Sequence, residues 1–71
     1  MTKSEFTEEI YEALKHKPAY FRDGQFVFNY IDREFGGVAR KSQFEYGIDC
    51  FYRDEQIPAF IDKCYELIQV K

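Results

Sequence analysis

Residues 22–30 read RDGQFVFNY, and this stretch decides the fold because it opens a helix that is apolar around much of its girth. The helix is expected from about Gly24 to Phe35, with Asp23 as its N-cap and the glycines at 36–37 as its stop. Its apolar residues are Phe26, Val27, Phe28, Tyr30, Ile31 and Phe35. A helix with so wide an apolar face contacts neighbours on more than one side, so it is expected at the centre of the domain.

Two further helices are expected to flank it. The first spans about residues 2–16, where Thr2 and Glu5 match a capping box and Pro18 follows as a helix stop. The last is expected from about Glu55 to Val70, because its apolar residues recur at helical spacing. They are Ile57, Phe60, Ile61, Cys64, Leu67 and Ile68.

The stretch between the glycines and the last helix fits no single period. A short helix from Val38 to about Tyr46, ended by Gly47, is favoured, and a strand from Phe44 to Ile48 is the alternative. The fold class that follows is all-α. A single helical domain, 1–71, is expected, with three main helices and one short helix around an aromatic core.

Eight Phe and six Tyr are more rings than a 71-residue domain can easily bury, because so short a chain buries only about 60% of its unfolded surface. The surplus rings are either edges of the core or a contact patch for a partner. The candidate partner-binding residues are Tyr20, Tyr46, Phe51 and Tyr52, with Tyr11 as a further exposed anchor.

The net charge of −3 and the pI of about 5.0 argue against a protein that neutralises many phosphates, so nucleic-acid binding is not expected. The alternative is a DNA-binding regulator with a helix-turn-helix-like segment at residues 24–46. Its recognition element would present Arg40, Lys41, Ser42 and Gln43. The sequence contains no apolar run that predicts a membrane span and no signal peptide, so a soluble cytoplasmic protein is expected.

Catalysis, metal binding and cofactor binding are not expected. Cys64 belongs to an apolar stripe, Cys50 adjoins Asp49, and the only histidine, His16, lies at the polar end of the first helix. The two cysteines are expected to be reduced and buried. Asp54 is interpreted as a cap of the last helix, and Asp49 as part of the turn near Gly47, rather than as catalytic or cation-binding carboxylates.

Two motifs resemble segments of small uncharacterised proteins from bacteriophages and prophages. The first is R-x-G-Q-x-x-F-N, and the second, about twenty residues later, is D-x-F-Y-x-D followed by I-P-x-F. The matching residues are Arg22, Gly24, Gln25, Phe28, Asn29, Asp49, Phe51, Tyr52, Asp54, Ile57, Pro58 and Phe60. The resemblance implies a phage or mobile-element context and an intracellular setting, and it carries no catalytic residues.

The two motifs are expected to meet in space as a structural clasp. Gln25 and Asn29 share a helical face, and their amides are expected to bond the backbone of the turn at 49–54, while Arg22 pairs with Asp49 or Asp54. The function expected is a non-enzymatic accessory protein that binds a protein partner. A homodimer is also considered, because a small core with spare aromatic rings often self-associates.

Overall fold

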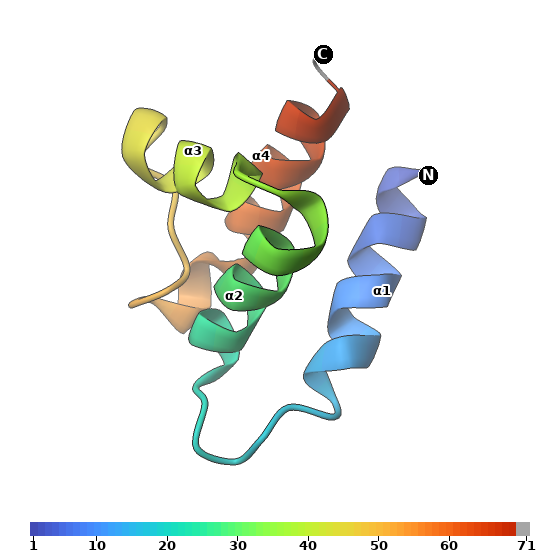
Figure 1. Cartoon of the computed structure of the whole chain (residues 1–71), viewed down its shortest axis with the longest axis vertical. Helices are drawn as coiled ribbons and strands as arrows, with labels where there is room; N and C mark the ends of the chain where they lie inside the picture. The colour runs from blue at the N-terminus through green and yellow to red at the C-terminus, as the bar shows by residue number, and fades with distance from the viewer. Residues whose placement is uncertain (70–71) are drawn as a thin grey trace.

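The computed structural model describes residues 1–69 and contains four α-helices and one 3-10 turn, with no strand in that range. The helices are α1 (Lys3–Leu14), α2 (Asp23–Phe35), α3 (Val38–Glu45) and α4 (Ile57–Gln69), and the 3-10 turn is η1 (Asp54–Gln56). Figure 1 shows α1 beside α2, α4 passing behind α2, and α3 crossing near the C-terminal end of α2. The all-α prediction is confirmed.

The local signals in the sequence account for most of the helix boundaries. Thr2 Oγ1 accepts from the Glu5 N–H at 3.1 Å, and Glu5 Oε1 accepts from the Thr2 N–H at 2.7 Å, which is the predicted capping box. Gly36 ends α2 with φ +79°, and Gly47 follows α3 with φ +68°. Glycine adopts this left-handed backbone without steric cost, so both stops have a physical reason.

Residues 38–45 are helical, which decides the ambiguous stretch in favour of the short helix over the strand. The last helix differs from the prediction at its start, because η1 precedes it and α4 begins at Ile57. Pro58 is then the second residue of α4, where its missing N–H has no helical partner to lose. The predicted end at Val70 lies outside the described residues.

The central position of α2 is also confirmed, since it contacts α1, α3, α4 and η1. Its buried Val27 and Ile31 meet apolar residues of every other helix in one core. The buried core residues are Phe6, Ile10, Val27, Phe28, Ile31, Ala39, Cys50, Ile57, Phe60, Ile61 and Cys64. Phe28 stacks on Phe60 at a centroid distance of 5.5 Å, which joins α2 to α4.

A hydrogen bond between side chains ties α1 to α2. The Tyr30 hydroxyl donates to Glu9 Oε2 at 2.7 Å. Partial burial, the hydrogen bond and the negative charge of Glu9 raise the pKa of Tyr30 to about 12. Within the described residues, no helix is both long enough and apolar enough to cross a membrane.

Candidate functional site: a fastened turn beside a polar hollow

The N-terminus of α2 is the point where the two sequence motifs meet. The Gly24 N–H donates to Asp54 Oδ1 at 3.0 Å, so Asp54 satisfies a donor that the first helical turn leaves free. The Cys50 thiol donates to the Gly24 carbonyl oxygen at a sulfur–oxygen distance of 3.2 Å. The Arg22 guanidinium donates to the carbonyl oxygen of Phe51. These three bonds fasten the turn that contains Cys50 to the beginning of α2.

Gly24 is required by the closeness of this contact. A Cβ atom at this position would overlap the carbonyl oxygen of Cys50 and lie 2.8 Å from Asp54 Oδ1. The carbonyl belongs to the backbone and cannot turn away as a flexible side chain can. The glycine therefore allows the turn to approach the helix closely, which is a packing role rather than a conformational one.

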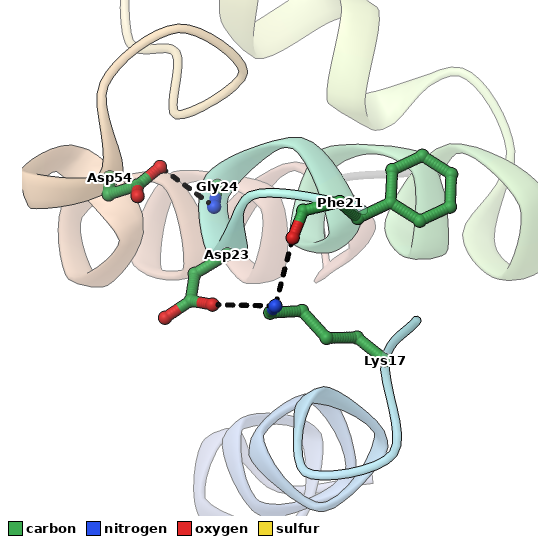
Figure 2. Close-up of polar contacts among 5 residues, drawn as sticks. All are labelled: Lys17, Phe21, Asp23, Gly24 and Asp54. Carbon is green, nitrogen blue, oxygen red and sulfur yellow. Dashed lines mark hydrogen bonds and ion pairs between the residues drawn. The ribbon is translucent and has the colours of Figure 1, made fainter. Parts of the chain in front are cut away.

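Lys17 fastens the connector between α1 and α2 to the same helix end. Its Nζ donates to the Phe21 carbonyl oxygen at 2.8 Å and lies 3.5 Å from Asp23 Oδ1, as Figure 2 shows beside the Gly24–Asp54 bond. The Lys17 side chain is only 21% exposed, so water screens this ion pair less than it screens pairs at the open surface. Two segments, the connector before α2 and the turn at 50–54, thus converge on the start of α2.

Two of the predicted capping roles were wrong. The backbone of Arg22 is extended, at φ −77° and ψ 157°, so Arg22 is the N-cap and Asp23 is already helical. The carboxylate of Asp23 pairs with Lys17 instead of capping. Asp54 caps α2 rather than the last helix, where η1 begins without a side-chain cap. A tertiary contact has therefore replaced the local cap of α2.

The clasp therefore forms through groups other than the two predicted amides. Asn29 is exposed and Gln25 is partly exposed. The side-chain hydrogen bonds of the described residues include none from either amide. Arg22, which was expected to pair with Asp49 or Asp54, bonds the Phe51 backbone instead. Gln25 and Asn29 lie on the polar side of an amphipathic helix, where water satisfies an amide without a protein partner.

The fastened turn forms part of the wall of a hollow of about 530 Å³, which opens between the end of α3 and η1. It is lined by Gln43, Gly47, Asp49, Tyr52, Arg53 and Gln56, most of which have polar side chains. Asp49 is half-buried, and its Oδ1 accepts from the Phe51 N–H at 2.8 Å, so it stabilises the residues that follow it rather than the predicted turn at Gly47. The volume of the hollow is within the range of about 300–1,000 Å³ that is typical of ligand pockets.

The candidate partner-binding rings fall into separate groups. Phe51 packs edge-on against Phe28 at 5.4 Å and turns inward, while the adjacent Tyr52 is 71% exposed. Tyr20 is 82% exposed and packs on its neighbour in the connector, Phe21, at 4.9 Å. Only Tyr52, of these, lines the hollow.

Two further rings lie on or next to α3. Tyr46 is partly exposed, and Lys63 Nζ lies 4.5 Å from its ring centroid. Phe44 is 77% exposed and was not predicted as a binding residue. The sequence signal that could have identified Phe44 is that it does not fit an apolar face of the short helix. The sequence named Gln43 only for DNA recognition and did not indicate Gln56, since nothing in their spacing shows that α3 and η1 bring them to one hollow.

The residues proposed for DNA recognition are only partly available. Ser42 is fully buried, and its Oγ donates to the Ile48 carbonyl oxygen at 2.8 Å. Arg40 Nε lies 3.5 Å from Asp32 Oδ1 on α2. Lys41 is exposed and Gln43 lines the hollow.

The two thiols lack the low pKa and the exposure of a reactive cysteine. Cys50 and Cys64 are both free and fully buried, and burial raises the pKa of each thiol to about 12. His16 is exposed just beyond the end of α1, beside Glu12. A scan against protein-family models found no match, and searches of the curated proteins and of the solved structures found none either.

Proposed function

We propose that the chain is a non-enzymatic interaction module that binds a partner protein through the surface around the hollow. The observation that carries this proposal is an exposed Tyr52 on a turn that is fastened to α2 at Gly24. Tyrosine is enriched among the residues that contribute most to protein–protein affinity. A ring on a fastened turn loses little freedom on binding, so more of its contact energy appears as affinity.

The wider setting is proposed from the sequence resemblance alone: an accessory protein of a bacteriophage or prophage that works in the cytoplasm. A nucleophile needs a low pKa or an adjacent base. Both thiols have a raised pKa and His16 adjoins neither of them, which supports a binding role over catalysis. The alternative of a DNA-binding regulator has less support, because Ser42 is buried and the chain carries a net negative charge.

A photo-crosslinking residue placed at position 52 tests the proposal in cells that express the chain. The matched control places the same residue at Tyr11, which is also partly exposed but lies on α1, an element without contact to α3 or η1. We expect a discrete adduct from position 52 and not from position 11. Equal adducts from both positions, or none from position 52, would contradict the proposal.

The same experiment separates the other candidates. An adduct of twice the chain's mass would identify the partner as a second copy, and sedimentation at several concentrations would then show a dimer. A gel shift at low salt addresses DNA directly, since retardation of a DNA duplex by the purified chain would favour the regulator instead.

A further inference from the structure

The groups that line the hollow differ in how firmly they are held. Asp49 is half-buried, and the bond from the Phe51 N–H fixes the orientation of its carboxylate. Gln43 and Gln56 are also partly buried. Arg53, by contrast, is exposed on a long and flexible side chain. The occupant that the hollow prefers should therefore be set by Asp49 and the two amides rather than by Arg53.

Asp49 is the lining group that can only accept hydrogen bonds. Gln43 and Gln56 each contribute an amide that can accept as well as donate, and the exposed Tyr52 contributes the face of its ring. The ion pairs of the described residues include none to Asp49. A carboxylate with one oxygen bonded to an N–H and no cationic partner retains capacity for further donors.

Most of the charged residues around the hollow are acidic, which also favours a cationic occupant. Asp54 and Glu55 follow Arg53 directly and are exposed, and the whole chain carries a net charge of −3. A cation that approaches this surface meets the carboxylates of Asp49, Asp54 and Glu55. It is opposed by Arg53 and by Arg22, whose guanidinium bonds the Phe51 carbonyl. Anionic occupants meet the reverse.

We propose that the hollow receives an arginine side chain of the partner protein. Its guanidinium would donate to Asp49 and to the amide oxygens of Gln43 and Gln56, and its plane would stack on the ring of Tyr52. Arginine fits better than lysine, because a planar group with five donors can stack and bond several acceptors at once. This inference rests on the proposed function and names the chemistry that the partner presents.

The test uses three capped tripeptides, Gly-Arg-Gly, Gly-Lys-Gly and Gly-Glu-Gly, titrated into the full ¹⁵N-labelled chain. We expect the arginine peptide to shift the amide signals of residues 43, 47, 52 and 56 at millimolar concentration, more strongly than the lysine peptide. The glutamate peptide should leave them in place. Stronger binding of the glutamate peptide, or no shift with any peptide, would overturn the inference.

Two substitutions sharpen the test because they should change the affinity for the arginine peptide in opposite directions. Asp49→Asn keeps an oxygen for the Phe51 N–H but removes the charge, and it should weaken arginine binding about tenfold. Arg53→Gln removes one opposing charge and should strengthen it by about twofold. An anion-binding hollow would give both effects with the sign reversed.

The control is Glu8→Gln, which removes one negative charge from α1, away from the hollow. This variant should bind the arginine peptide as tightly as the unsubstituted chain. If it lost as much affinity as Asp49→Asn, net charge alone would explain both losses, and the inference would be overturned. Failure here is distinct from failure of the proposed function. If position 52 still yields its crosslinked partner and Asp49→Asn leaves that adduct unchanged, the module stands and the arginine is wrong.

Discussion

Asp54 Oδ1 accepts a 3.0 Å hydrogen bond from the Gly24 N–H, so the cap of α2 comes from a residue 30 positions later in the chain. An N-cap side chain ordinarily belongs to the residue that precedes the helix and bonds the N–H two or three positions on. Here Arg22 occupies that position, and its guanidinium bonds the Phe51 carbonyl instead. The cap is therefore also a tertiary contact, and it links the stability of α2 to the position of the turn.

Asp54→Ala should lower the free energy of unfolding by about 1 kcal/mol, the usual cost of losing a helix cap. Asp54→Asn should cost only a few tenths, because the amide oxygen can still accept from the Gly24 N–H. Urea unfolding of both variants measures the difference. Glu55→Ala is the matched control, since Glu55 is exposed and caps nothing. If both Asp54 variants unfold like the unsubstituted chain, the tertiary cap is wrong.

Gly24→Ala should destabilise the fold by about 2–3 kcal/mol, because the added methyl group overlaps a backbone carbonyl that cannot rotate away. Helix propensity alone predicts the opposite, a gain of up to about 1 kcal/mol. Gly37→Ala provides the comparison, since it has a negative φ and open space around the added atom. Its expected cost is below about 1 kcal/mol. A stabilised Gly24→Ala variant would show that the turn does not approach α2 closely.

The sequence predicted the helices well because periodicity and stop signals act within a few residues. The capping box at Thr2 and the stop at Gly36 are examples in which the interacting groups are close in the chain. The N-terminus of α2 could not be predicted in the same way, because its cap comes from Asp54 and its glycine is explained by the carbonyl of Cys50. Local rules instead assigned the cap to Asp23.

The candidate site was predicted only in outline. Pairing the two motifs correctly placed the turn against α2, but the spacing of Gln25 and Asn29 shows only that they share a face. Whether that face is buried depends on how the neighbouring helices pack. The hollow depends on packing as well, since Gln43 and Gln56 come from separate elements that meet only in the folded chain.

Asn29→Ala tests the revised account of the clasp. Asn29 is exposed on α2, and alanine has the higher helix propensity, so the free energy of unfolding should change by less than about 0.5 kcal/mol or rise. Thermal and urea unfolding of this variant are sufficient. A loss above about 1 kcal/mol would mean that the amide has a buried partner after all, as the sequence motif first indicated.

The stability of the chain should fall in alkaline solution above about pH 9. Burial raises the pKa of Cys50 and of Cys64 to about 12, whereas an unfolded thiol ionises near 8.5. Between these values the native state retains protons that the unfolded state has released, so the free energy of unfolding decreases as pH rises. Each thiol contributes a slope of up to about 1.4 kcal/mol per pH unit.

Urea unfolding at a series of pH values from about 8 to 11 measures this slope, with a reducing agent present. The Tyr30 hydroxyl, whose pKa is raised to about 12, adds to the decrease from about pH 10 upwards. Tyr30→Phe should therefore make the decrease with pH slightly less steep between pH 9 and 10, and clearly less steep above pH 10. A free energy of unfolding that stays constant up to pH 11 would show that the thiols ionise as readily in the native state as in the unfolded one.

Ser42→Ala should destabilise the end of α3. Ser42 Oγ donates to the Ile48 carbonyl oxygen at 2.8 Å, and the Ser42 carbonyl accepts from the Ile48 N–H at 3.1 Å, so the two residues are bonded in both directions. Removing the hydroxyl leaves a partly buried carbonyl without that donor, at a cost of about 1–3 kcal/mol. Ser4→Ala, at an exposed position of α1, is the control.

Hydrogen exchange of the Ile48 amide shows whether this loss is local. The Ile48 N–H is bonded to the Ser42 carbonyl, so its exchange reports local opening of this segment. Without the Ser42 hydroxyl the segment should open more often, and exchange at Ile48 should accelerate more than the fall in global stability explains. That result would mean that the hydroxyl holds the segment leading from α3 to the hollow, and it would account for a serine in the core. Unchanged exchange at Ile48 and an unfolding free energy equal to that of Ser4→Ala would show instead that the backbone bond alone is sufficient.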